Sequence, residues 1–598
     1  MRGMRMQKEP AAVFQKTPSN AEPGRVWCVG DWAKIDPQTG DVHGLGGSRD
    51  ALCLRNDVWD AGVGVVQLRG VRNEFVAFQM VVESLGPAIH KVSVAAQDFE
   101  GPVRISAGSN VQLFRELYVP IEGKWYPDAL LPFDLGSALL FSIPESASGI
   151  PGQRVAVVWV DIYVPKGIPA GMYEATFKVG YRSTMRLSEF TVRLEVLDLT
   201  LPDDLSLDVD LMTYGSVSMA RGFPDVVVDS PRYRAIEREF YRAAHAHRTT
   251  FALVPYNHDG TIPKGLAPPL RGTGERISVA SWTQWDAFFG PLLDGSAFAD
   301  LPRAGVPVDH FFLPFGLEYP SSFRHWGTDR FDVENRAIAS EFIYHLAHKG
   351  WTQPAYLVYY NSRERYGFFP WNLYEPTRQD DVEALLYLSK MIRSTLHGHP
   401  GVRVLFRLDI GHFHCAEHEA CLPNMEQNLR GYIDLWNIDS SHWNERSASV
   451  IRELVEKDGV QAWFYQGASR VQETLQAMHD YPWLAWKRGA QGIGFWNATD
   501  WVDWDTDDVA PDPYQTAGGR YQGASMLMYP GCKYAVEGPI VSMRLKALRR
   551  GLQEYELLEM ASELRGRERT ETLVNATFPC QPQDWTIQRD RLLALLVG

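Results

Sequence analysis

The chain has 598 residues, 45% of them hydrophobic, which is enough to build about two to four domains with buried cores. Its formal net charge of −14 argues against nucleic acid or an anionic membrane as the main partner, because the average surface field repels both. The sequence contains no run of about eighteen apolar residues, so we expect no membrane-spanning helix. Residues 1–14 lack the apolar core of a signal peptide, and we therefore expect a cytoplasmic protein.

The cysteine and aromatic contents narrow the class further. The six cysteines are scattered along the chain, so we expect reduced thiols and no disulfide framework. Aromatic residues make up 12% of the chain and include 19 tryptophans. The flat C–H faces of sugar rings pack on aromatic rings, so this content favours a carbohydrate ligand, although large cores also use tryptophan.

After an N-terminal extension over residues 1–24, short alternating or β-branched runs fill residues 25–200. Turns rich in Pro and Gly separate these runs, and the pattern predicts an antiparallel β-sandwich. Pro202 cannot continue a strand ladder, so we place the domain boundary at residue 200. The predicted strands are 63–68, 75–82, 91–96, 111–117, 154–164, 173–179 and 188–196.

From residue 201 to 565, apolar strands alternate with helical segments, as in a parallel sheet covered on both faces. Eight β-then-α units predict a (β/α)8 barrel of the TIM type, with a helical run over 539–564 closing it. An open doubly wound sheet is the alternative, although no glycine-rich phosphate loop follows any strand. Residues 566–598 are expected to form a polar tail with a short helix over 589–596. The predicted barrel strands are 207–214, 250–256, 310–315, 355–360, 402–410, 432–438, 460–466 and 492–498, and the predicted helices include 231–245, 332–348, 378–397, 448–457 and 471–489.

Barrels of this kind place their chemistry at the carboxyl ends of the strands. The sequence is rich in carboxylates there. Glycoside hydrolysis needs one carboxylic acid to protonate the leaving oxygen and a second group to stabilise or attack the anomeric centre. The polar and aromatic side chains near predicted strand ends are Tyr214, Asn257, His258, Glu318, Glu364, Glu375, Asp409, Asp439, Gln466, Asn497, Asp500 and Trp501.

Each charged candidate also has a purely structural interpretation. Glu318 directly follows an apolar strand, so a barrel directs it into the mouth, but it can equally be a solvated loop acid. Glu375 precedes a predicted helix, where an acid favours the helix dipole. Arg407 and Asp409 lie on one face of their strand because side chains alternate, so they either hold substrate or form an ion pair inside the barrel.

An aromatic run over 494–504 follows the eighth predicted strand. Trp496 and Trp501 are interleaved with Asn497 and Asp500, a combination that can form a sugar platform with hydroxyl-binding groups. Core packing alone is the alternative for this run.

A metal site and serine hydrolase chemistry are both weakly supported. The cluster His412, His414, Cys415, His418 and Cys421 brings soft and imidazole ligands together, but its spacing matches no standard zinc ribbon. We therefore interpret it as a polar loop and expect no metal. No Gly-x-Ser-x-Gly elbow is present.

Longer motifs lie in both halves of the chain. They are Asn56-Asp57-Val58-Trp59-Asp60, Arg72-Asn73-Glu74-Phe75, Tyr163-Val164-Pro165, Trp483-Leu484-Ala485-Trp486-Lys487, 492–496, Tyr529-Pro530-Gly531, Gly538-Pro539-Ile540, 542–551 and Glu554-Tyr555-Glu556. On these motifs, residues 25–560 resemble family-123 glycoside hydrolases and related bacterial proteins. The resemblance implies a β-sandwich followed by a barrel.

The resemblance also implies a chemistry. Family-123 enzymes release N-acetylgalactosamine from β-linked glycans with an adjacent Asp-Glu pair after the fourth strand. The Asp orients the acetamido group of the substrate, whose oxygen attacks the anomeric carbon, and the Glu is the general acid and base. In Tyr374-Glu375-Pro376, Glu375 matches the acid and Tyr374 stands in the position of the Asp. A phenol is uncharged at neutral pH and stabilises an oxazolinium cation less well than a carboxylate does.

We therefore expect a glycosidase that acts on an oligosaccharide or glycoconjugate with Glu375 as general acid and base. Glu318 is the expected second carboxylate of an exo-glycosidase for a sugar other than a hexosamine. Two alternatives remain: a substrate-assisted hexosaminidase that uses Tyr374, and a barrel that binds glycan without cleaving it. We expect no cofactor, and neither a nucleic acid nor a membrane as a partner. The sequence leaves the oligomeric state open, so a homo-oligomer is one alternative. The expected substrate contacts are Tyr214, Trp371, Arg407, Asp409, Trp496, Asn497, Asp500 and Trp501.

Overall fold

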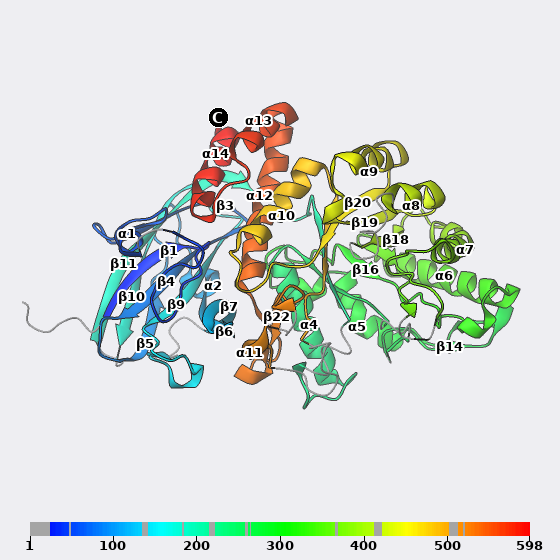
Figure 1. Cartoon of the computed structure of the whole chain (residues 1–598), viewed down its shortest axis with the longest axis horizontal. Helices are drawn as coiled ribbons and strands as arrows, with labels where there is room; N and C mark the ends of the chain where they lie inside the picture. The colour runs from blue at the N-terminus through cyan, green and yellow to red at the C-terminus, as the bar shows by residue number, and fades with distance from the viewer. Residues whose placement is uncertain are drawn as a thin grey trace, which may run out of the picture.

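The computed structural model has a sheet-rich N-terminal part, a barrel, and C-terminal helices that lie against both (Figure 1). None of the helices in the described ranges combines the length and the apolar character needed to cross a lipid bilayer. The structure describes residues 24–46, 49–133, 141–181, 185–214, 222–256, 261–263, 265–364, 367, 369–411, 421–501, 512–517 and 521–598.

The N-terminal part consists of two packed sheets. One has the strand order β1-β4-β9-β6-β7 and the other the order β2-β3-β11-β10-β5-β8. The ring of Phe78 on β4 lies 5.9 Å from that of Phe177 on β10 and 6.4 Å from that of Phe190 on β11, so the two sheets share one core. The strands are β1 (Gly24–Gly30), β2 (Trp59–Asp60), β3 (Val65–Arg72), β4 (Glu74–Ser84), β5 (Ile89–Ala96), β6 (Val111–Ile121), β7 (Lys124–Phe133), β8 (Phe141–Ile143), β9 (Val155–Val164), β10 (Gly171–Tyr181) and β11 (Met185–Thr200).

The expectation of purely antiparallel sheets is wrong for one pair. β3 and β11 run parallel, with Val65 beside Thr191 and Leu68 beside Leu194. A short hairpin forces antiparallel pairing, whereas these two strands lie at opposite ends of the domain's chain and no hairpin joins them.

The eight parallel barrel strands predicted from the sequence are confirmed. They form one sheet in the order β13-β12-β21-β20-β19-β18-β17-β16. The end strands β13 and β16 lie next to each other without a hydrogen-bonded ladder, and the Thr250 hydroxyl donates to Asp309 across this seam at 3.2 Å. The barrel is therefore nearly closed. Its strands are β12 (Asp208–Thr213), β13 (Thr250–Leu253), β16 (His310–Phe312), β17 (Ala355–Val358), β18 (Val404–Ile410), β19 (Leu435–Asp439), β20 (Gln461–Gln466) and β21 (Gly492–Trp496).

A helix follows each of these strands and covers the outside of the sheet. The α4 helix shows why such segments begin where they do, because the Ser230 side chain accepts the Tyr233 N–H and Pro231 occupies the first turn. The helices are α4 (Pro231–Ala246), α5 (Thr283–Leu293), α6 (Asp329–Lys349), α7 (Gln379–Leu396), α8 (Cys421–Leu429), α9 (Glu445–Asp458), α10 (Gln476–Arg488) and α12 (Met543–Arg565).

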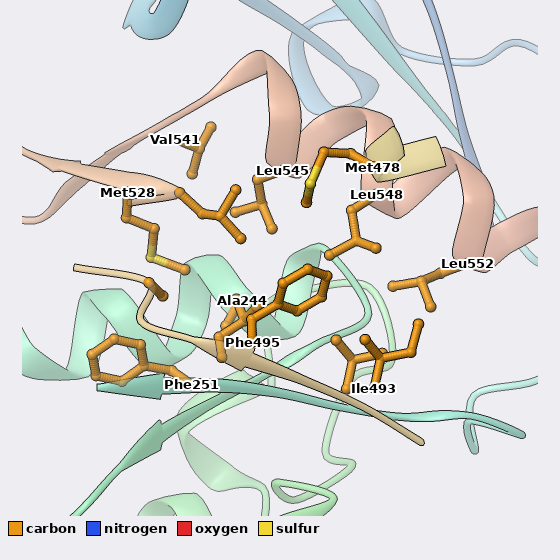
Figure 2. Close-up of a cluster of buried hydrophobic side chains, with 14 of the residues drawn as sticks. Ala244, Phe251, Met478, Ile493, Phe495, Met528, Val541, Leu545, Leu548 and Leu552 are labelled. Atoms are coloured by element: carbon orange, nitrogen blue, oxygen red, sulfur yellow. The ribbon is translucent and has the colours of Figure 1, made fainter. Parts of the chain in front are cut away.

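The helix α12 packs its apolar face on the barrel. Leu545, Leu548 and Leu552 lie over Ile493 and Phe495 of β21 (Figure 2). This helix begins later than predicted: residues 539–541 form the short strand β23, and the Ser542 side chain caps the helix by accepting the Leu545 N–H.

Charged residues of α12, next to these leucines, pair with the sandwich. The Arg544 guanidinium binds both carboxylate oxygens of Asp128 on β7, at 2.9 and 2.8 Å. Asp161 on β9 accepts from Lys546 at 2.6 Å and from Arg549 at 2.7 Å. All of these side chains are buried, so α12 joins the two parts of the chain through compensated charges (Figure 1).

The C-terminal residues contain more helix than the predicted polar tail. The helix α13 (Arg567–Thr577) precedes α14 (Trp585–Val597). Trp585 is fully buried, and its ring stacks on His479 of α10 at 4.0 Å. The Arg589 guanidinium of α14 donates to both carboxylate oxygens of Glu74 on β4 at 2.7 Å. These residues therefore bind the tail to both domains.

We predict that Asp161→Asn lowers the free energy of unfolding by about 3–5 kcal/mol, because it leaves Lys546 and Arg549 buried without their counter-charge. The matched control is Asp198→Asn, which removes an exposed partner of Arg72 and costs less than about 1 kcal/mol. Urea unfolding followed by circular dichroism measures both. Equal losses in the two variants would contradict this account of the interface.

Candidate active site at the barrel mouth

Glu375 lies at the barrel mouth, the rim formed by the carboxyl ends of the strands. It belongs to the loop between β17 and α7, and its carboxyl group reaches across to the end of β18. There it packs directly on Gly411. A Cβ atom at this residue would lie less than 3.0 Å from the Glu375 carboxyl group, which is closer than real Cβ atoms come to other heavy atoms. The absence of a side chain at residue 411 therefore makes room for the Glu375 carboxyl.

The environment of Glu375 raises the pKa of its carboxyl group to about 7. Burial is the largest cause, because it disfavours the charged form. The Arg363 guanidinium opposes this shift, whereas the negative charges of Asp409 and Asp439 add to it. A hydrogen bond with the Tyr374 side chain lowers the pKa slightly. At neutral pH a large fraction of Glu375 is thus protonated and able to donate a proton.

Aromatic side chains line the interior next to Glu375. They form a cluster distinct from the main hydrophobic core, and its members come from the ends of several strands. Tyr374 is buried in it, and Trp496 lies partly exposed at its edge. Tyr214 and Tyr465 both lie within electrostatic range of Glu375 and Asp409. The structure therefore brings residues from β12, β18, β20 and the loop after β17 to one place.

Several buried polar atoms at this rim have no hydrogen-bond partner within the described ranges. They are Oδ1 of Asn361, the hydroxyl of Tyr256, Nε2 of Gln466 and Nε1 of Trp496. Asn361 is 4% exposed and Tyr256 is 1% exposed, so water reaches neither side chain freely. The second polar group of Asn361, its Nδ2, donates to the Tyr214 hydroxyl at 2.7 Å. Donors and acceptors of this kind suit a ligand rich in hydroxyl groups.

Tyr374 is fixed on two sides. Its backbone carbonyl accepts from the Tyr359 hydroxyl at 3.3 Å. The guanidinium of Arg363 lies over its ring, 3.8 Å from the centroid. This stacking holds a positive charge beside Glu375 and restricts where the Tyr374 ring can move.

Arg407 and Asp409 lie inside the barrel, below the mouth. The Asp409 carboxylate accepts from Arg407 at 2.7 and 3.0 Å, and Arg407 also pairs with Asp210 of β12. All three side chains are about 1% exposed or less. This geometry matches the interpretation of Arg407 and Asp409 as an ion pair inside the barrel. Arg407 pairs with two carboxylates at once. Burial raises the pKa of Asp409, and Arg407 opposes this shift.

The structure does not bring Glu318 into the group around Glu375. Glu318 is exposed on the turn after β16, where its carboxylate accepts the Phe323 N–H at 3.3 Å. Trp371 lies partly exposed in the loop that carries Glu375, and its ring contacts Trp326 at 4.5 Å and Phe323 at 5.7 Å. These rings form an aromatic wall beside the mouth.

The residues that follow β21 differ in their surroundings. Trp496 faces the mouth, where its ring contacts Tyr521 at 5.7 Å. Trp501 is 1% exposed, packs against Phe223 and Phe240, and donates to the Met528 carbonyl at 2.7 Å. Trp501 therefore packs in the core, which is the alternative interpretation of the aromatic run over 494–504. Asn497 and Asp500 are buried as well; they accept from the Thr499 N–H and the Ser525 hydroxyl, respectively.

Sequence reasoning missed several residues of this site, which are Tyr256, Asn361, Arg363, Gly411 and Tyr465. Gly411 has no signal of its own, because nothing in the sequence shows that a distant carboxyl group packs on it. Arg363 lies in the irregular loop after β17, where nothing in the sequence distinguishes it from an ordinary surface arginine. Residues 257, 258 and 412–420 lie outside the described residues, so the His/Cys cluster is not described. Within the described ranges, no three His, Cys, Asp or Glu side chains are grouped to hold a metal ion.

Comparisons with known proteins agree with this fold. No protein-family model and no curated protein matches the chain. A solved family-123 glycoside hydrolase from Clostridium perfringens superposes with a TM-score of 0.63 and 14% identity, over 96% of this chain and 98% of that one. β-Glucuronidases from Parabacteroides merdae and Bifidobacterium dentium also match, with 10% identity over 85% and 89% of this chain and 63% and 67% of theirs. Their TM-scores of 0.28 are too low to carry an argument.

The resemblance to family 123 is thus confirmed for the fold. The superposition spans the sandwich, the barrel and the helices that follow. This chain has the fold of a family-123 glycoside hydrolase over nearly its whole length.

Proposed function

We propose that this protein is a glycoside hydrolase that acts on an oligosaccharide or glycoconjugate, with Glu375 as the general acid and base. The observation that carries the proposal is the Glu375 carboxyl at the barrel mouth, seated on Gly411 with a pKa of about 7. A carboxylic acid must still be protonated at neutral pH to give its proton to a leaving sugar oxygen.

The surroundings of Glu375 support a sugar as the substrate. Trp496, which is partly exposed at the rim, offers aromatic surface on which a sugar ring can pack. The unpartnered Oδ1 of Asn361 offers an acceptor to its hydroxyl groups, and the unpartnered Nε2 of Gln466 offers a donor. In the proposed reaction, Glu375 protonates the glycosidic oxygen as its bond to the anomeric carbon breaks. The resulting carboxylate then takes a proton from the water that completes hydrolysis.

We predict that Glu375→Gln lowers kcat/KM by about 100-fold to 10,000-fold on glycosides with poor leaving groups, because the amide cannot donate the proton. The loss is expected to be smaller on dinitrophenyl glycosides, whose leaving group needs no acid. Glu383→Gln, on the exposed surface of α7, is the control. A panel of nitrophenyl and natural glycosides provides the measurement. Full activity of Glu375→Gln on every substrate would end the proposal.

The pKa of Glu375 predicts the alkaline limb of the pH profile. The acid form is the active one, so kcat/KM is expected to be maintained below the pKa and to fall tenfold per pH unit above about 7. Initial rates at low substrate concentration over a pH series measure this limb. A profile that stays flat well beyond pH 7 would contradict the assignment of the acid.

We predict that Gly411→Ala lowers kcat/KM by about 100-fold, because the new methyl group displaces the Glu375 carboxyl by about 1 Å. Gly316→Ala is the matched control at the same rim. Its Cβ would meet only Tyr256 at 3.7 Å, an ordinary contact. Neither glycine has a left-handed backbone conformation, so alanine strains neither position. Steady-state kinetics and thermal melts of both variants test this, and equal kinetics in the two would refute the seating of Glu375 on Gly411.

A further inference from the structure

Resting on the proposed function, we infer that Asp439 is the second catalytic carboxylate, and that the enzyme is a retaining glycosidase for sugars without an acetamido group beside the anomeric carbon. Asp439 is the last residue of β19, half-buried at the mouth. This assignment replaces Glu318, which lies exposed on another loop.

The strand register places Asp439 opposite Glu375. In the β18–β19 ladder, Asp409 pairs with Asn437 and Ile410 with Ile438. Continued by one residue, this register puts Gly411 beside Asp439. The Glu375 carboxyl occupies the space of the missing Gly411 side chain, so it lies one strand away from Asp439.

The side chain of Asp439 also points the right way. Side chains alternate along a strand, so Asp439 shares a face with Asn437. The Asn437 amide extends into the barrel, where it lies against the Cα of Gly494 on β21, two strands away. Asp439 is therefore directed inward at the level of the rim. Tyr465 is its partner on β20 and lies within electrostatic range of Glu375.

From the spacing of the two strands we infer the distance between the two carboxyl groups. Neighbouring strands are about 4.8 Å apart, which brings the carboxyls to a separation of the order of 5 Å. Retaining glycosidases hold their two carboxyls about 5 Å apart, whereas inverting enzymes need about 6.5–9.5 Å to admit a water. The negative charge of Asp439 also acts on Glu375. The buried Asn361, whose Nδ2 donates to the Tyr214 hydroxyl at the same rim, has an Oδ1 without a partner in the described ranges, and this oxygen offers an acceptor to a polar ligand.

In the first step, a carboxylate oxygen of Asp439 attacks the anomeric carbon and forms an ester bond. The glycosidic bond breaks, its electron pair stays on the leaving oxygen, and that oxygen takes the proton from Glu375. In the second step, Glu375 removes a proton from water, the water oxygen bonds to the anomeric carbon, and the ester bond breaks to restore the Asp439 carboxylate. The net reaction is hydrolysis with retained configuration.

A local structural role for Asp439 must be separated from a catalytic one. Its Oδ1 accepts the Ser441 N–H at 2.9 Å and the Ser441 hydroxyl at 2.6 Å, and an asparagine keeps this acceptor. Asp439→Asn is therefore expected to keep the thermal melt of the wild type and to lower kcat by about 1,000-fold or more. Asp458→Asn, at the end of α9 outside the barrel, is the control.

The decisive measurement is covalent trapping. Nitrophenyl glycosides of glucose, galactose, mannose, xylose and the N-acetylhexosamines first identify the sugar that the wild type cleaves. The matching fluoro-sugar, with fluorine beside the anomeric carbon, is then added, and the digested protein is analysed by mass spectrometry. We expect the added mass on the peptide that contains Asp439.

The other outcomes overturn the inference and are distinguishable from one another. Label on another acid such as Glu318, or full activity of Asp439→Asn, would rule out Asp439 as the second catalytic carboxylate. In that case an inactive Glu375→Gln would still support the proposed function. Turnover confined to N-acetylhexosaminides shows substrate assistance instead. Absence of turnover by the wild type on the whole panel ends the inference and the proposed function together.

Discussion

Arg407 compensates two carboxylates at the axis of the barrel, and the electrostatics of the mouth depend on this pairing. Asp210 and Asp409 are both buried, and each would cost several kcal/mol if left unpaired. With Arg407 between them, the charge below Glu375 is partly neutralised. The pKa of Glu375 then reflects its own burial and the balance of Asp439 and Asp409 against Arg363. That balance leaves the pKa of the Glu375 carboxyl at about 7, so the same group can donate a proton in one step and accept one in the next.

The interface formed by α12 gives this mouth a stable frame. Its leucines cover β21 while its charged residues pair with Asp128 and Asp161 of the sandwich. Separating the two parts would expose apolar surface and unpair buried ions at the same time. The Tyr529 hydroxyl, which donates to Asp128 at 2.7 Å, ties the segment after β21 to the same network. The sandwich therefore supports the rim, and none of its described residues belongs to the group around Glu375.

Much of this fold could be predicted from the sequence because the spacing of apolar residues along the chain indicates which side chains are buried. The eight barrel strands are short and mostly apolar, as strands covered on both faces require, with polar residues such as Asp210, Arg407 and Asp409 directed into the barrel. The strand β7 escaped prediction because Pro127 and Pro132 interrupt it. Both are tolerated because β7 is an edge strand of its sheet. The helix α13 escaped because its sequence is polar and it buries few side chains.

The candidate site was less accessible to prediction, since strand ends reveal which residues reach the rim but not which of them meet. Glu318 follows the strand β16, and Asp439 is the last residue of β19. Only the register of β18 with β19, together with the bare Cα of Gly411, shows that Asp439 is the neighbour of Glu375. Alternation along the strand places Arg407 and Asp409 on one face, but it does not reveal that Asp210 on β12 accepts from Nη1 of Arg407.

The resemblance to family 123 implies that Tyr374 stands in the position of the family's Asp, and this arrangement offers a physical explanation for that difference. At that position a carboxylate would stabilise the cation formed when an acetamido oxygen attacks the anomeric carbon. Tyr374 brings no negative charge. Its ring is covered by Arg363 and its side chain hydrogen-bonds with Glu375, so it is engaged with the acid and not with a substrate cation. A site without a negative charge at residue 374 needs one at another residue to stabilise the oxocarbenium-like anomeric centre. Asp439 supplies it from the adjacent strand, on the side of Gly411 where the sugar would meet Glu375, and in doing so removes the need for an acetamido group in the substrate.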